Sequence, residues 1–188
     1  MAKPNNNHFE QVVIAGFGGQ GIILVGKLLA QAAMKAGKEV TFMPSYGAEV
    51  RGGASSCIIT IADEPIPSPV VSKAQCVIAM SKAALNKFEN TVEQDGLLIM
   101  NSSQIDVQPK TDASVSVVKI PIDEIAVRLG SPKVANMVAL GAYLQKSGCL
   151  SPDLAADCLP DVLAERYHVT IPVNKKALRA GADFVKGL

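Results

Sequence analysis

The sequence predicts an α/β fold with a mostly parallel sheet in a three-layer sandwich. Short apolar runs alternate with longer amphipathic segments almost throughout the chain, which is the order of strands and helices in parallel sheets. The chain has 188 residues, a suitable length for one α/β domain, and its hydrophobic fraction of 48% supports a substantial core. We therefore expect a single domain over residues 1–188.

The first strand, turn and helix are marked by glycine. The apolar run at residues 12–15 is followed by residues 16–21, which read Gly-Phe-Gly-Gly-Gln-Gly, and then by a second apolar run. Glycine permits positive φ and close approach of a ligand, and a helix that begins near Gly21 directs free N–H groups at the turn. This order makes the predicted fold Rossmann-like, with a first helix that Gly37 ends.

The remaining elements follow from periodicity and from breaker residues. Strands are expected at residues 39–43, 55–62, 75–80, 96–100 and 115–120, and helices at residues 82–88, 121–129 and 133–146. Ser151 caps a further helix, which Pro160 kinks or splits. Asn174 is expected to cap a last helix over residues 175–186, and His168 to lie before a terminal strand.

A second glycine-rich segment connects two predicted strands. Residues 44–54 read Pro-Ser-Tyr-Gly-Ala-Glu-Val-Arg-Gly-Gly-Ala. A connection of this length in a compact domain is typically functional or disordered. Arg51 offers planar bidentate donors that suit phosphate or carboxylate, and Gly52 and Gly53 would let the backbone approach a partner closely. The alternative is a surface turn closed by an ion pair between Arg51 and Glu49.

Composition and charge exclude several classes of function. Charged residues make up 19% of the chain and the net charge is +1, so a basic surface for nucleic acid is not expected. No apolar stretch is long enough to span a membrane, and the polar first eight residues contain no signal core, so we expect a cytoplasmic protein without a membrane partner. The weakly charged composition favours contact with other subunits, or a homodimer when the chain is isolated.

No catalytic or metal-binding set can be assembled from the sequence. The four cysteines are Cys57, Cys76, Cys149 and Cys158. No pair has the close spacing of zinc or cluster ligands. Cys57, Cys76 and Cys149 have apolar neighbours and are expected to be buried hydrophobic side chains. Asn136 stands out within an apolar helix, where an unpaired amide is costly, and it is expected to hydrogen-bond a loop of the domain.

A dinucleotide site is the simplest interpretation of the first glycine segment, but the second strand argues against it. That strand lacks at its end the carboxylate that would bind a ribose, and Glu39 lies at its start. Two other classes of function stay open on the residues alone. They are a stand-alone nucleotide-binding or regulatory module and an NAD-dependent dehydrogenase.

Taken together, the two glycine segments resemble the gamma subunit of 2-oxoacid:ferredoxin oxidoreductases, most closely the 2-oxoglutarate and branched-chain types. The similar residues are 15–21, 44–54, 63–66, 68–69, Asn174, Ala177 and Gly181. The resemblance spans nearly the whole chain. It implies one subunit of an enzyme that oxidatively decarboxylates a 2-oxoacid to an acyl-CoA and carbon dioxide and reduces ferredoxin.

The resemblance also implies partners, cofactors and site residues. In this family alpha-, beta- and delta-type subunits, or equivalent domains, hold thiamine diphosphate and the iron–sulfur clusters. This chain is therefore expected to bind neither, to be inactive alone, and to serve ferredoxin only through the complex. The ligand that the resemblance implies is coenzyme A. The residues expected to contact a ligand or partner are Gly18, Gly19, Gln20, Gly21, Ser45, Tyr46, Gly47, Glu49, Arg51, Gly52 and Gly53. None is expected to be catalytic or to bind metal.

Overall fold

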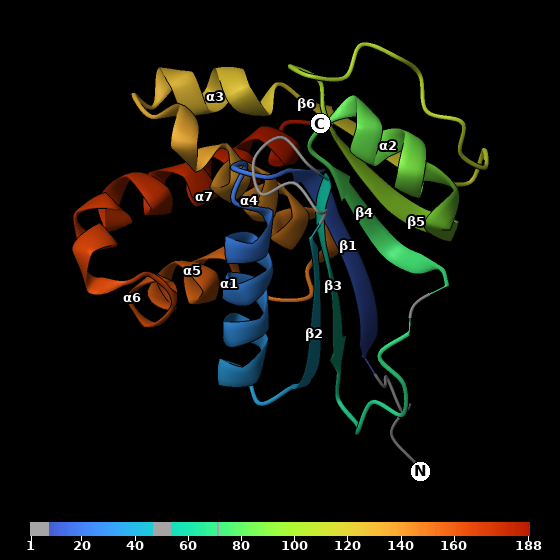
Figure 1. The fold of residues 1–188 in the computed structure, drawn as a ribbon, viewed down its shortest axis with the longest axis horizontal. Coiled ribbons are helices and arrows are strands. Elements are labelled where there is room, and N and C mark those ends of the chain that lie inside the picture. The colour runs from blue at the N-terminus through green and yellow to red at the C-terminus, as the bar shows by residue number, and fades with distance from the viewer. Residues whose placement is uncertain (1–7, 47–53, 71) are drawn as a thin grey trace.

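The computed structural model describes residues 8–46, 54–70 and 72–188, which are built around a six-stranded sheet (Figure 1). The strands are β1 (Phe9–Phe17), β2 (Glu39–Tyr46), β3 (Ala54–Ala62), β4 (Ala74–Ala79), β5 (Val92–Asn101) and β6 (Ser116–Ile120). Their order across the sheet is β2-β3-β1-β4-β5-β6. The central strands are buried on both faces, which explains why their sequences read as continuous apolar runs.

The sheet is mostly parallel, as predicted. β1 pairs with β4, β4 with β5 and β5 with β6, all in parallel. β3 is the exception, because it runs antiparallel to both of its neighbours, β1 and β2. Only residues 47–53 separate β2 from β3, fewer than the roughly dozen residues that a parallel crossover needs, so these two strands pair antiparallel.

Helices cover both faces of the sheet. They are α1 (Ile22–Lys35), α2 (Lys82–Phe88), α3 (Ile122–Arg128), α4 (Ala135–Ser147), α5 (Pro152–Asp157), α6 (Leu159–Val162) and α7 (Ile171–Lys186), with 3₁₀ turns at Glu89–Thr91, Pro132–Val134 and Glu165–Thr170. Val12 and Ile14 of β1 face a core that includes α1, α4 and α7, whereas Val13 and Ala15 face α2. Figure 1 shows α2 on the side of the sheet away from α1. The predicted three-layer sandwich is confirmed.

The end of α1 confirms the predicted role of Gly37. This glycine has a φ of 77°, in the left-handed region. The N–H groups of Gly37 and Lys38 donate to the carbonyl oxygens of Met34 at 2.9 Å and Ala33 at 3.0 Å. These two bonds complete the last turn of the helix before the chain enters β2.

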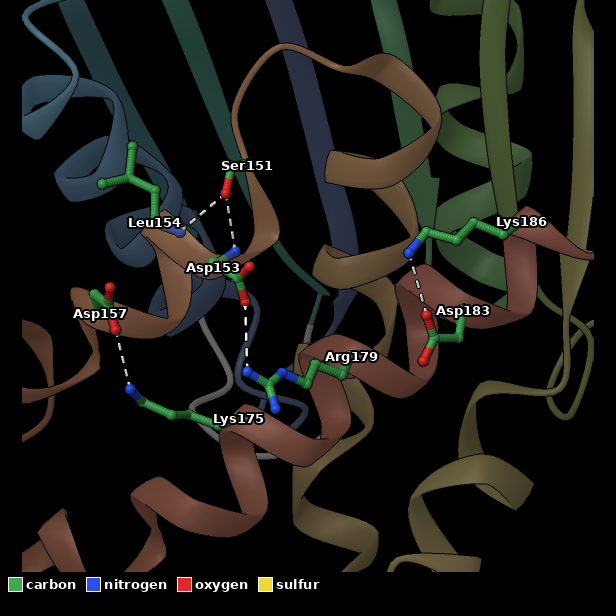
Figure 2. A network of polar contacts seen from close by, with 8 residues as sticks. All are labelled: Ser151, Asp153, Leu154, Asp157, Lys175, Arg179, Asp183 and Lys186. Atoms are coloured by element: carbon green, nitrogen blue, oxygen red, sulfur yellow. Dashed lines mark hydrogen bonds and ion pairs between the residues drawn. The ribbon is translucent and has the colours of Figure 1, made fainter.

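A polar network joins α5 to α7 (Figure 2). Ser151 Oγ accepts hydrogen bonds from two following N–H groups, at 3.1 and 3.3 Å, which confirms the predicted cap. Asp153 faces Arg179 at 3.7 Å, and Asp157 faces Lys175 at 3.0 Å. Because these four charged side chains are exposed, their ion pairs contribute little, and the join relies on the apolar contacts beneath them.

α4 and α7 pack with their backbones in contact. A Cβ atom at Gly141 would overlap the carbonyl oxygen of Leu178, and a Cβ atom at Gly181 would overlap the carbonyl oxygen of Val138. Each helix therefore has a glycine where the backbone of the other crosses it. No larger residue fits at either position without separating the two helices.

The C-terminal region differs from the sequence-based prediction in two places. His168 lies in the 3₁₀ helix Glu165–Thr170, not before a terminal strand, and α7 already begins at Ile171. Pro172 explains the early start, because proline is favoured in the first turn of a helix even beside β-branched neighbours. Asn174 is consequently inside α7 and does not cap it; its Nδ2 group donates to the carbonyl oxygen four residues earlier, at 2.8 Å.

Strand β2 is longer than predicted. It continues through Pro44 to Tyr46, where the sequence indicated the start of the long connection. Proline is tolerated there because β2 lies at the edge of the sheet, so the missing N–H group does not interrupt a second ladder. The connection between β2 and β3 is shortened accordingly to residues 47–53.

A buried polar cluster lies between the start of β1 and the end of α4. The fully buried Tyr143 donates a hydrogen bond from its hydroxyl to Glu10 Oε1 at 3.0 Å and accepts one from Cys149 Sγ at 3.2 Å. Burial raises the pKa of Glu10, and the bond from Tyr143 partly opposes that rise. Burial likewise raises the pKa values of Tyr143 and Cys149, so both keep their protons.

We expect Glu10→Gln to stabilise the protein at pH 7–8. Glu10 has a higher pKa in the folded state than in the unfolded state, so its ionised form opposes folding at neutral pH. Glutamine keeps an acceptor for Tyr143 without the charge. The melting temperature of the variant should exceed that of the wild type at pH 8, and the difference should shrink as the pH falls towards about 4, the ordinary range of the group. Equal pH profiles of the two proteins would contradict this result.

Candidate functional site

The first glycine segment and the strand residues that flank the second one lie at the same edge of the sheet. β1, which ends at the first segment, pairs its last residue Phe17 with Ala54, the first residue of β3. Tyr46, the last residue of β2, pairs with Ser55 of β3. The ends of β2 and β3 that flank residues 47–53 therefore lie beside the first segment. β4, β5 and β6 also end at this edge, where open α/β sheets bind their ligands.

The first glycine turn is held in place by the side chain of Gln20. Its Oε1 atom accepts a hydrogen bond from the N–H group of Phe17 at 2.7 Å, and its Nε2 atom donates to the carbonyl oxygen of Met80 at 3.2 Å. The backbone N–H group of Gln20 donates to the carbonyl oxygen of Phe17 at 3.1 Å. The turn is thus closed on itself and tied to the residue that follows β4.

Two glycines of the turn have a backbone conformation that other residues rarely adopt. Gly19 has a φ of 100°, and Gly21, the residue before α1, has a φ of 74°. Asn136 at the start of α4 donates from Nδ2 to the carbonyl oxygen of Gly21 at 3.2 Å, which confirms the predicted bond to a loop. The amide of Asn136 occupies the space that a Cβ atom at Gly21 would need.

A groove of about 310 Å³ opens in front of the turn. It is lined by Gly19, Gln20, Met80, Asp123, Pro132, Lys133 and Ala135. Asp123 accepts hydrogen bonds from Asn101 Nδ2 at 2.9 Å and Gln104 Nε2 at 2.5 Å, so both of its oxygens are engaged. Lys133 has no carboxylate within 4.0 Å among the described residues.

Two positive features border this groove, together with the carboxylate of Asp123. The N-terminal end of α1 contributes a positive dipole end, and no acidic residue occupies its first turn. Lys133 adds a full positive charge beside Gly19 and Gln20. Chemically, the arrangement can bind and orient an anionic ligand, whereas the described groove residues offer no nucleophile–base pair.

The structure places the predicted site residues unevenly. Gly18, Gly19, Gln20 and Gly21 form the turn, and Ser45 lies exposed near the end of β2, at the same edge. Tyr46 ends β2. Gly47, Glu49, Arg51, Gly52 and Gly53 lie outside the described residues.

Sequence reasoning missed Met80, Asp123 and Lys133. All three are far from the first glycine segment in the sequence, and only folding brings them beside it. Met80 directly follows β4 and Asp123 lies just after β6, so both are at the carboxyl edge of parallel strands, and the rule that ligands bind at that edge could have found them. Lys133 lies in the 3₁₀ turn before α4, where no such rule points to it.

The described residues do not fit a metal or cluster. Nowhere in residues 8–46, 54–70 and 72–188 do three or more His, Cys, Asp or Glu side chains gather in a way that could hold a metal ion. Cys57 and Cys76 are buried as predicted, whereas Cys149 is only partly buried. Cys158 is buried as well, and burial raises the pKa of Cys57 to about 12. Such thiols do not readily become ligands. None of the described helices is long and apolar enough to cross a membrane.

Comparison with known sequences defines the class. The family model described as pyruvate ferredoxin/flavodoxin oxidoreductase matches residues 11–184. The chain therefore belongs to the pyruvate ferredoxin/flavodoxin oxidoreductase family, whose homologues are subunits of 2-oxoacid:ferredoxin oxidoreductases. The resemblance noted from the two glycine segments is confirmed, and the comparisons do not support a stand-alone module or an NAD-dependent dehydrogenase.

Individual relatives show which members of the family the chain is similar to. The chain is 32% identical over 177 residues to the ketoisovalerate oxidoreductase subunit VorA of Methanothermobacter marburgensis, covering 94% of this chain and 36% of that protein. It is 35% identical over 146 residues to the 2-oxoglutarate synthase subunit KorC of Methanocaldococcus jannaschii, covering 77% of this chain and 78% of that protein. The chain thus spans about a third of VorA and most of KorC.

A solved structure agrees with this assignment. The gamma subunit of a keto/oxoacid ferredoxin oxidoreductase from Geobacter sulfurreducens has a TM-score of 0.80 and 27% identity, with 95% of this chain and 99% of that chain covered. The domain fold described above is therefore that of a gamma subunit.

Proposed function

We propose that this chain is the gamma subunit, or gamma-equivalent part, of an enzyme that oxidatively decarboxylates a 2-oxoacid to acyl-CoA and carbon dioxide and passes the electrons to ferredoxin. The observation that carries the proposal is that Tyr46 and Ala54, which flank residues 47–53, lie beside the first glycine segment at one edge of the sheet. The substrate class is 2-oxoglutarate or a branched-chain 2-oxoacid, in line with the names of the VorA and KorC relatives.

In this proposal the chain binds a ligand and supports assembly without performing the chemistry itself. Partner subunits of alpha, beta and delta type hold thiamine diphosphate, which supplies the carbanion chemistry, and the iron–sulfur clusters. The complex acts in the cytoplasm, and a homodimer is the proposed state of the isolated chain.

Coenzyme A is the proposed ligand of the carboxyl edge. The helix dipole of α1, the ammonium group of Lys133 and the guanidinium group of Arg51 would bind its anionic part, while Gly19 and Gly21 give the turn its shape. The site thereby positions the acyl acceptor for the partner subunits that carry the reaction.

Purification of the native complex tests the proposal. The chain should co-purify with subunits that contain thiamine diphosphate and iron–sulfur clusters, and the complex should reduce ferredoxin with 2-oxoglutarate or 2-oxoisovalerate. The separated chain should be colourless and inactive with every 2-oxoacid, and activity should return on recombination. Turnover by the chain alone, or purification without such partners, would overturn the assignment.

Arg51→Ala tests the ligand contact within the same complex. The Michaelis constant for coenzyme A should rise about tenfold or more, because charge-assisted bonds of this kind contribute roughly 1.5–3 kcal/mol. Lysine should rescue only in part, since it lacks the planar fork. Unchanged kinetics together with a lower melting temperature would show that Arg51 is structural.

A further inference from the structure

A small hollow lies under α2, on the face of the sheet opposite α1. Its volume is about 120 Å³. Ala15, Ser45 and Ser56 line it from the sheet, and Ala83, Ala84 and Lys87 line it from the helix. Gly16 and Phe17 also border it, so it adjoins the glycine turn but lies on the other side of β1 from α1.

The pairing of the strands explains why the hollow exists. Ser45 pairs with Ser56, Ser56 with Ala15, and Ala15 with Ala79, so one row across β2, β3, β1 and β4 consists of small side chains. Residues paired in this way project from the same face of a sheet. Ala15 and Ala79 belong to the core under α2, so Ser45 and Ser56 face α2 as well. The residues of α2 that face this row include the small Ala83 and Ala84, so the space between helix and sheet is not filled.

Ser56 brings a hydrogen-bonding group into this space. The residue is only 8% exposed, and its hydroxyl group takes part in none of the hydrogen bonds between the described residues. Buried polar groups are nearly always paired, with protein, water or a ligand. Since Ser56 faces the hollow, its hydroxyl group can donate to a molecule held there. Ser45 contributes a second hydroxyl group from the adjacent strand.

Lys87 gives the hollow its charge. Its side chain is exposed in the last turn of α2, and its ammonium group lies 5.1 Å from the centre of the Phe88 ring. Within the described ranges no carboxylate lies within 4.0 Å of it. An unneutralised cation next to two hydroxyl donors favours an anion with several acceptor oxygens.

We propose that the hollow binds a phosphate group, held by the hydroxyl groups of Ser45 and Ser56 and by the ammonium group of Lys87. Three donors from three elements suit the tetrahedral oxygens of phosphate better than a planar carboxylate. The phosphate is either inorganic phosphate or an ester of the ligand. Only the second source rests on the proposed function, in which coenzyme A would carry the phosphate ester.

Titration of the full 188-residue chain with inorganic phosphate tests the site. Binding is followed by amide chemical shifts in two-dimensional NMR spectra, with Lys87→Gln and Ser56→Ala as variants. Lys27→Gln is the matched control for charge, because Lys27 is an exposed helix lysine on α1. Ser116→Ala is the control for a strand serine away from the hollow. Thermal melting of each variant verifies that it is folded.

We expect phosphate to shift the amides of Ala15, Ser56 and Lys87. Both variants should weaken binding at least fivefold, and both controls should bind as the wild type does. Unaltered binding by the two variants, or shifts confined to the glycine turn, would overturn the assignment of the hollow.

A second arm separates the two sources of phosphate. If coenzyme A displaces inorganic phosphate but pantetheine, which has no phosphate, does not, the hollow takes the ester of the ligand. If coenzyme A does not bind at all while phosphate still shifts the hollow, the hollow is a site for free phosphate, and the coenzyme A part of the proposed function fails on its own.

Discussion

Gly181→Ala should lower the free energy of unfolding by roughly 3 kcal/mol, a large loss for a single methyl group. In an exposed helix the same change would normally stabilise by up to about 1 kcal/mol. Here the new Cβ atom would overlap the Val138 carbonyl oxygen, so α4 and α7 must move apart along their whole contact. Urea denaturation followed by circular dichroism measures the effect, and Gly141→Ala should behave in the same way.

The matched control is Gly187→Ala, at the end of the same helix. There the nearest heavy atom to an added Cβ is the carbonyl oxygen of Phe184 at 3.6 Å, an ordinary contact, so the change should be close to neutral. A stability of Gly181→Ala equal to that of this control would mean that the two helices can separate without cost.

Gly21→Ala should cost about 2–3 kcal/mol of stability and should also weaken ligand binding at the carboxyl edge. Alanine at a φ of 74° is strained, at roughly 1–2 kcal/mol, and its Cβ atom would collide with the amide of Asn136. Thermal melting gives the stability, and coenzyme A titration of the complex gives the binding.

Gly19→Ala separates strain from collision. Gly19 also has a positive φ, of 100°, but an added Cβ atom would meet no other atom within 4 Å. The Gly19→Ala variant should therefore lose only the roughly 1–2 kcal/mol of stability that backbone strain costs. The double variant Gly21→Ala/Asn136→Ala should lose less stability than the sum of the two single variants, because the colliding amide is removed. If the two losses simply add, the collision does not occur.

The sequence predicted the architecture well because the strands and helices have clean patterns. The glycine turn, the ends marked by Gly37 and Ser151 and the buried central strands all express local preferences that the fold preserves. Where a local preference competed with context, prediction failed. Pro44 reads as the end of a strand but is accepted at an edge, and β-branched residues around Pro172 read as a strand but form a helix.

The site was predictable only in part, because the sequence shows segments and not their neighbours. The amide of Asn136 could be recognised as needing a partner, and the structure supplies that partner from a residue 115 positions away. The bond from Gln20 to Met80 depends on how β4 lies beside β1, and the presence of Lys133 in the groove depends on where α4 begins. No local sequence pattern encodes either arrangement.

The two hydrogen bonds made by the Gln20 side chain affect how fast and how tightly a ligand binds. Since its side chain already closes the turn and ties it to β4, the N–H groups at the start of α1 point the same way before and after a ligand arrives. Binding then loses little entropy to ordering of the turn, and more of the interaction energy is expressed as affinity. Association at the turn should accordingly be a single fast step, without the delay of a receptor that must first rearrange.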